Sequence, residues 1–254
     1  MSDYDRNASA RWGQSVGRAG ADIDQGLRAY MLGVYNHMTL GLAITALTAL
    51  GTKMLATTTT AAGKMALTPF GHALYQTPLK WVVMLAPLAF VLFFSFRIDR
   101  MSASTARTMF IAFAAVMGLS LSTALLVFTG ASVVRAFFIT AAAFGGLSLY
   151  GYVTKRDLSA FGAFLVMGLI GLILASVANL FFASSAFQFG LSILSVLIFA
   201  GLTAWDTQAI KQMYYASDDY ETATKKSVNG ALMLYLDFIN IFQSLLSLTG
   251  SRNE

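Results

Sequence analysis

Seven long, nearly uncharged apolar stretches divide this chain, and each is long enough to cross a lipid bilayer as a helix. A spanning helix needs about 20 mostly apolar residues to cross about 30 Å of hydrocarbon. The strands of a membrane β-barrel would instead alternate over about 10 residues, and runs such as GAFLVMGLIGLILASVANLFF do not alternate. The sequence therefore predicts an all-α membrane protein with seven transmembrane helices, at about residues 31–51, 79–97, 106–128, 131–152, 158–182, 186–206 and 228–248.

The composition supports a membrane protein and excludes several kinds of site. Only 11% of the residues are charged and 57% are hydrophobic, whereas a soluble domain has about 25% charged residues. Cysteine is absent, so no disulfide or thiolate site is possible, and the two histidines, His37 and His72, argue against a His-rich metal centre. Nucleic-acid binding is disfavoured because the basic residues are dispersed.

The distribution of positive charge predicts the orientation in the membrane. Residues 1–30 are polar and charged, with no apolar core of a signal peptide, and we interpret them as an N-terminal tail. Seven spans over residues 31–250 would place 12 of the 17 lysines and arginines on the side of this tail and 5 on the other. Because positive residues concentrate in the cytoplasm, we expect a cytoplasmic N-terminus and a C-terminus on the opposite side.

Glycines inside the spans are the expected positions of close helix packing, because small residues let helix backbones approach in lipid. The candidates are Gly118, Gly145, Gly146, Gly162, Gly168, Gly171, Gly190 and Gly201.

Two aspartates lie inside predicted membrane spans, where acidic residues are rare. Of the twelve acidic residues, ten lie in tails or loops, and only Asp206 and Asp237 lie in apolar helix. An aspartate at the centre of a bilayer costs about 2.5–3.5 kcal/mol, so it marks a functional site by default. Asp206 lies roughly 7 Å and Asp237 roughly 9 Å from the cytoplasmic end of its apolar run, at 1.5 Å per residue. The two can meet at one depth if their helices are neighbours.

Two carboxyl groups held close in a medium of low dielectric constant do not both ionise easily, so we expect the pair to share a proton and to respond to pH. When deprotonated, the pair would attract a cation. Calcium takes 6–8 oxygen ligands and two aspartates offer at most four, which favours weak binding in transit over tight storage. Asn240 and Gln243 could add oxygens. The alternative is that each aspartate accepts structural hydrogen bonds from neighbouring hydroxyls.

Arg97, which ends the second span, could pair with the two aspartates or extend to the lipid headgroups. His37, near the cytoplasmic start of the first span, is expected to form interfacial hydrogen bonds.

The last two spans, AWDTQAI and ALMLYLDFINIFQSLLSL, closely resemble the signature helices of the Bax inhibitor-1 (transmembrane Bax inhibitor motif) family. GLSLS at residues 118–122, AFFITAAAFGGLSLYGYVTKRDLS at residues 136–159 and YNHMTLGL in the first span support the likeness. It covers about residues 30–250. One departure is that the family's usual Gly-Pro between the third and fourth helices is missing, where this chain has TGASVV.

The resemblance implies a bacterial member of the family in the cytoplasmic (inner) membrane, with seven helices and the last one central, surrounded by the other six. It also implies a pH-sensitive calcium leak controlled by a di-aspartyl pair at Asp206 and Asp237. The arginine latch of the family falls on Arg97, with Arg100 as the reserve candidate. The expected partners are the bilayer, calcium and protons, and no tightly bound cofactor is expected.

Three other classes remain to be weighed. The chain could be a regulatory protein that binds a membrane protease or a stress-response partner. An intramembrane aspartyl protease also uses two aspartates on adjacent helices, but its Gly-x-Gly-Asp and Tyr-Asp motifs are absent here, and we expect no enzyme activity. A retinal protein is disfavoured because the seventh span has no lysine for a Schiff base.

Overall fold

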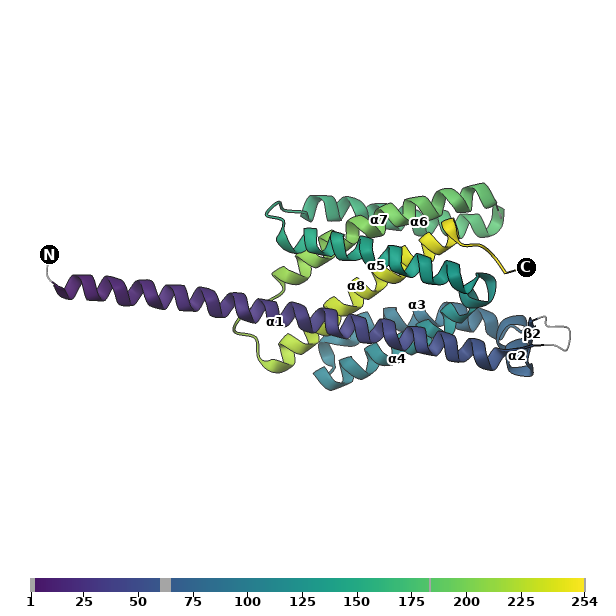
Figure 1. The fold of residues 1–254 in the computed structure, drawn as a ribbon, viewed down its shortest axis with the longest axis horizontal. Helices are drawn as coiled ribbons and strands as arrows, with labels where there is room; N and C mark the ends of the chain where they lie inside the picture. Colours follow the sequence, from purple (N-terminus) through teal and green to yellow (C-terminus); the bar gives the residue numbers. More distant parts are fainter. Residues whose placement is uncertain (1–2, 60–64, 183, 254) are drawn as a thin grey trace.

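The computed structural model describes residues 3–59, 65–182 and 184–253, and is almost entirely helical (Figure 1). The elements in chain order are α1 (Asp3–Ala56), β1 (Thr57–Thr59), β2 (Met65–Leu67), α2 (Pro69–Gln76), α3 (Leu79–Arg97), η1 (Ile98–Arg100), α4 (Ala103–Val127), α5 (Gly130–Val153), α6 (Ser159–Phe182), α7 (Ser185–Gln212) and α8 (Tyr220–Thr249). Within these residues, seven helices (α1 and α3 to α8) are long and apolar enough to cross a membrane. The predicted all-α membrane fold is confirmed.

Hydroxyl and carboxylate side chains determine where the later helices begin. A backbone N–H three residues ahead donates to the side chain that precedes α4, α5, α7 and α8. These N-caps satisfy donors that the first turn of a helix leaves free. They are Ser102, Thr129, Ser184 and Asp219.

Helix α1 extends well beyond the first apolar stretch. The segment predicted as a polar tail is helical from Asp3 and continues without a break into the span, projecting from the bundle (Figure 1). No proline interrupts residues 3–56, so helical hydrogen bonding can continue past the point where the apolar pattern stops. Helix α8 likewise begins at Tyr220, eight residues before the predicted span.

Helix α8 is the centre of the bundle. In its most apolar 18-residue window 56% of the residues are buried, against 17–33% in the other six spans. It packs directly against α1, α4, α5 and α7, while α3 packs chiefly on α4 and α6 on α7. The two termini lie at opposite ends of the molecule (Figure 1). The predicted central last helix is confirmed, and we call the end nearer the N-terminus the cytoplasmic end, following the charge distribution.

Three short elements in the connection from α1 to α3 were not predicted. β1 and β2 form a short antiparallel hairpin at the end opposite the cytoplasm, and α2 follows it. The C-terminus also adds order at this end, because residues 251–253 bond to the α4–α5 turn: Thr129 N–H donates to the Ser251 carbonyl at 3.0 Å and Asn253 N–H to the Val127 carbonyl at 2.9 Å. This turn is where the Gly-Pro is missing.

Close packing at glycine is confirmed at some of the predicted positions and wrong at others. A Cβ on Gly118 would lie 2.5 Å from the Thr45 carbonyl oxygen of α1, and Gly162 and Gly201 are equally crowded by side chains of the neighbouring helix. Gly145, Gly146, Gly171 and Gly190 have nothing within 4 Å of such an atom. In lipid, a glycine on an outer helix face is tolerated as readily as one at an interface, so composition alone does not separate the two.

Candidate functional site

Asp206 and Asp237 face each other across the contact between α7 and α8. Both are buried, with 7% and 3% of their surface exposed, and their carboxyl groups are close enough to interact directly. A carboxylate can only accept a hydrogen bond. A hydrogen bond between the two groups would therefore require a proton on one of them, and a pair bonded in this way is neutral or bears a single negative charge.

Each carboxyl group keeps a buried oxygen without a partner. Asp206 Oδ1 and Asp237 Oδ2 accept no hydrogen bond, and they are two of only four such buried side-chain atoms in the part of the chain that the structure describes. Burying a polar atom without a hydrogen bond costs several kcal/mol in an apolar medium. The arrangement therefore reduces stability.

The sequence around the two aspartates brings their helices close together. Gly230 of α8 lies against Ile210 of α7, where a Cβ on the glycine would sit 2.9 Å from the Ile210 Cγ2. On its other side α7 meets α5 at Gly151, whose missing Cβ would collide with the backbone carbonyl of Ala204. Helix α7, which carries Asp206, is thus held between α5 and α8 by close contacts at two glycines, one with the backbone and one with a side chain of α7.

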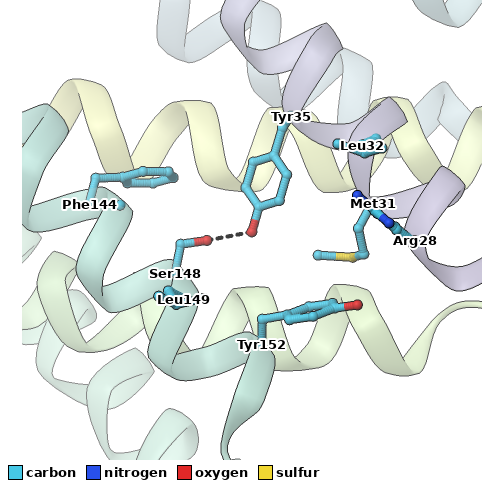
Figure 2. Close-up of a pocket in the computed structure, with 9 residues that line it drawn as sticks. Arg28, Met31, Leu32, Tyr35, Phe144, Ser148, Leu149 and Tyr152 are labelled. Carbon is cyan, nitrogen blue, oxygen red and sulfur yellow. Dashed lines mark hydrogen bonds between the residues drawn. The ribbon is translucent and has the colours of Figure 1, made fainter. Parts of the chain in front are cut away.

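A chain of hydroxyl groups runs across the bundle next to this site. The Tyr35 hydroxyl of α1 bonds to Ser148 Oγ of α5 at 2.5 Å (Figure 2). Ser148 Oγ also bonds to Thr207 Oγ1 of α7 at 3.0 Å. Thr207 Oγ1 donates in turn to the Thr203 carbonyl at 2.7 Å. Every member is paired, in contrast with Asp206 one residue away. Serine and threonine are so common in the spans that nothing in the sequence distinguished these.

Gln208 is a second residue that the sequence did not reveal. Its side chain accepts from the Leu158 backbone N–H at 2.8 Å and donates to the Arg156 carbonyl at 2.8 Å. The amide thereby fastens the α5–α6 loop to α7 two residues after Asp206. A lone glutamine in AWDTQAI carries no spacing signal that would have predicted this role.

The positive residues at the cytoplasmic end do not contact the pair in this arrangement. Arg97 is exposed, with its guanidinium carbon 5.6 Å from the Phe93 ring centroid, and Arg100 is exposed as well. Lys211 donates to the Tyr152 carbonyl at 2.9 Å, and Lys226 pairs with Asp218 at 2.6 Å. Among the residues that the structure describes, no hydrogen bond or ion pair joins a cation to Asp206 or Asp237. The arginine latch stays a prediction.

The two auxiliary residues predicted beside Asp237 lie farther along α8. The Asn240 amide donates to the Leu236 carbonyl of its own helix at 2.8 Å, and the Gln243 side chain is exposed. His37 bonds to the Gly33 carbonyl at 2.7 Å and approaches Ser227 Oγ of α8 at 3.4 Å. Both of its contacts lie within the protein, and neither is with the aspartates.

The pair is a poor site for a tightly held metal. Over residues 3–59, 65–182 and 184–253, no three histidine, cysteine or acidic side chains converge. Two aspartates supply at most four of the 6–8 oxygens that calcium takes. The donor set suits a proton, or a cation that keeps much of its water.

Comparison with known proteins agrees with this architecture. Residues 27–254 match the family described as inhibitor of apoptosis-promoting Bax1. A protein of Rickettsia prowazekii is 44% identical over 232 residues, which cover 91% of this chain and 93% of that protein. A Caulobacter vibrioides protein is 41% identical over 259 residues, covering both chains fully. The inner membrane protein YbhL of Escherichia coli is 41% identical over 229 residues, 89% of this chain and 93% of YbhL.

Proposed function

The chain belongs to the Bax inhibitor-1 family and is a multi-pass inner membrane protein, and on that premise we propose that it is a pH-sensitive calcium leak channel gated by Asp206 and Asp237. The observation that carries the proposal is the buried carboxyl pair. Two acids lie close together inside the bundle, and Asp206 Oδ1 and Asp237 Oδ2 have no hydrogen-bond partner among the described residues.

The shared proton supplies the gate. While one carboxyl donates to the other, α7 and α8 are held together and the path past the aspartates is closed. Removal of that proton leaves two like charges in a medium of low dielectric constant, where their repulsion is far stronger than in water. The repulsion separates α7 from α8, admits water and attracts a cation to the two carboxylates. Calcium flux is therefore expected to rise with pH over the range in which the proton leaves.

Helix α3 provides the link to the arginine latch. Ile98 of η1, directly after Arg97, is buried in the same hydrophobic cluster as Leu234 and Phe238 of α8. A displacement of α8 therefore moves the end of α3 that carries Arg97. In the open state we place Arg97 near the deprotonated pair, where it limits the calcium current by competing for the carboxylates, with Arg100 as the alternative one turn on.

An intramembrane protease fits the site less well. Its two aspartates must hold a water molecule and admit a peptide, but Asp206 and Asp237 are nearly inaccessible. Neither lines either of the two cavities described for the bundle. A proton-controlled gate needs no room for a substrate in its closed state.

The test is calcium efflux from liposomes containing the purified protein, followed with a fluorescent indicator at pH 6, 7 and 8. We expect the double variant Asp206→Asn/Asp237→Asn to remove the pH dependence, because an amide pair can keep a hydrogen bond but cannot lose a proton. Asp157→Asn is the matched control, since Asp157 is exposed in the α5–α6 loop and makes only a local bond to Ser159. An unchanged pH profile in the double variant would exclude the proposed gate.

Absence of flux at every pH, in wild type and variants alike, would exclude the channel itself. The regulatory alternative would then be tested by co-purification of a membrane protease or stress-response partner from the membrane.

A further inference from the structure

A groove between α1 and α5 opens on the side of the bundle. The two helices each pack against α8 but make no extensive contact with one another. The space between them at the cytoplasmic half has a volume of about 570 Å³, within the range of about 300–1,000 Å³ that is typical of small-molecule sites. One wall is residues 28–35 of α1 and the other is residues 144–152 of α5 (Figure 2).

The groove faces the bilayer and not the cytoplasm. Leu32 on α1 and Leu149 on α5 line it and are 52% and 62% exposed. Both helices are membrane spans, so these leucines face hydrocarbon in the membrane. The Tyr35 side chain crosses the groove to bond to Ser148, which is buried, and closes it from the interior of the bundle (Figure 2). A molecule that occupies this space therefore enters from the lipid phase.

One end of the groove is positively charged. Arg28 lies at the cytoplasmic end, on the same side as Tyr152, with the apolar Phe144 at the opposite end (Figure 2). Lys211 adds a second charge there, since its Nζ lies 5.0 Å from the Tyr152 ring centroid. Arg28 is the one charged member of the nine residues that line the groove. Basic pockets between spans at the cytoplasmic side suit anionic lipid headgroups.

We propose that this groove binds one anionic phospholipid of the cytoplasmic leaflet. An acyl chain lies along Phe144, Leu149 and Leu32, and the phosphate lies at Arg28 with the Tyr152 hydroxyl at the same end. The polarity of the groove matches that of a lipid in this leaflet, with its charge at the cytoplasmic end and its hydrocarbon toward the middle of the membrane. The site is independent of the proposed channel, and its test does not measure ion flux.

Two adjacent glycines provide a matched test. Gly145 lines the groove and Gly146 does not, and a Cβ on either has nothing within 4 Å. Native mass spectrometry of the delipidated protein, titrated with phosphatidylglycerol or with phosphatidylcholine of the same acyl chains, counts the bound lipids. We expect one retained phosphatidylglycerol in wild type and in Gly146→Phe, and its loss in Gly145→Phe, whose ring fills the groove. Equal retention by the two glycine variants would overturn the site.

The headgroup is tested with a second pair of variants. Arg28→Gln should reduce the preference for phosphatidylglycerol over phosphatidylcholine about fivefold, the effect of one basic residue near an anionic surface. Arg135→Gln makes the same change at the far end of α5, outside the groove, and should leave the preference unchanged. Equal binding of the two lipids by wild type, or an unaltered preference in Arg28→Gln, would overturn the assignment of an anionic lipid.

Discussion

Two sets of polar side chains lie next to each other in this bundle, and they differ in how fully they are hydrogen-bonded. The hydroxyls of Tyr35, Ser148 and Thr207 form an unbroken series of hydrogen bonds from α1 through α5 to α7. Asp206 and Asp237 lie close together, and Asp206 Oδ1 and Asp237 Oδ2 have no hydrogen-bond partner among the residues that the structure describes. The same helix α7 carries a member of both sets, at adjacent positions.

We interpret the difference as one between a structural polar group and a functional one. Hydroxyl groups that are all hydrogen-bonded stabilise the packing of three helices and leave no atom free to bind a ligand. Acids with unpartnered oxygens weaken the fold and can still bind a proton or a cation. If this interpretation is right, removing the acids should stabilise the protein, and removing the hydroxyls should destabilise it.

The largest expected effect is a gain of stability when both acids are removed. Replacing a buried ion pair with apolar residues of similar size is often stabilising, by about 1–4 kcal/mol, and the same reasoning applies to two buried carboxyl groups. We expect Asp206→Leu/Asp237→Leu to raise the free energy of unfolding within that range and to abolish the leak. Unfolding in detergent, followed by circular dichroism, measures the change. A double variant that is less stable than wild type would mean that the carboxyl pair is structural.

The next effect tests the close packing that positions α7. A side chain at Gly151 would meet the backbone of Ala204, and backbone cannot move aside as the end of a side chain can. Overpacking of this kind costs about 1–3 kcal/mol, so Gly151→Val should lower the unfolding free energy by that amount. Gly146→Val, where no atom lies within 4 Å, should leave it unchanged. Similar values for the two would show that α5 and α7 do not depend on this contact.

A smaller loss is expected from the hydroxyl chain. Ser148→Ala removes the partner of both Tyr35 and Thr207, whereas Tyr35→Phe leaves the Ser148–Thr207 bond intact. Hydrogen bonds between membrane helices contribute about 0.6 kcal/mol on average and about 1.7 at most. Ser148→Ala should therefore cost more than Tyr35→Phe, each on this scale, with the pH response of the leak preserved in both. Loss of that response would connect the hydroxyls to the gate and remove the contrast with the acids.

The aspartates were predictable from the sequence because they violate a strong rule. Charge is rare in apolar spans, so Asp206 and Asp237 were identified without any knowledge of contacts, and the apolar runs fixed all seven spans. Depth along each helix also placed the two acids at a common level. Their actual contact depended on α7 and α8 being neighbours, which no short-range pattern encodes.

The parts that the sequence did not predict all depend on ordinary residues in particular surroundings. Serine at 148 and glutamine at 208 resemble many other polar residues of the spans, and only packing decides that the first joins α1 to α7 and the second holds a loop. Glycine is ambiguous for the same reason: Gly118 marks a close approach of helices, while Gly145 and Gly146 face open space. The N-terminal ends of α1 and α8 were missed because the polar segments 3–30 and 220–227 are also helical, and the prediction followed only the apolar pattern.

The smallest expected effect on stability concerns Asp219, an acid whose carboxylate, unlike the buried pair, accepts a hydrogen bond from a backbone N–H. Asp219 is exposed and caps α8, where it accepts from the Thr222 backbone N–H at 3.4 Å. Its pKa lies below the usual value of 3.8, mainly because the Thr222 side chain hydrogen-bonds to the carboxylate, with smaller contributions from backbone N–H groups. Because the pKa is lower in the folded state, the cap stabilises the protein above the unfolded-state pKa and is lost as pH falls through the folded one.

Asp219→Ala should therefore lower the melting temperature slightly at pH 7, and the difference from wild type should shrink once the pH falls below about 4, the range in which an aspartate becomes protonated. Asp219→Asn, which keeps an oxygen for the cap, should behave like wild type at pH 7. A deficit of Asp219→Ala that is as large at pH 3 as at pH 7 would show that the acid acts through packing and not through its charge. In that case the exposed acid would titrate without an effect on stability. Burial alone would then distinguish Asp206 and Asp237 from Asp219.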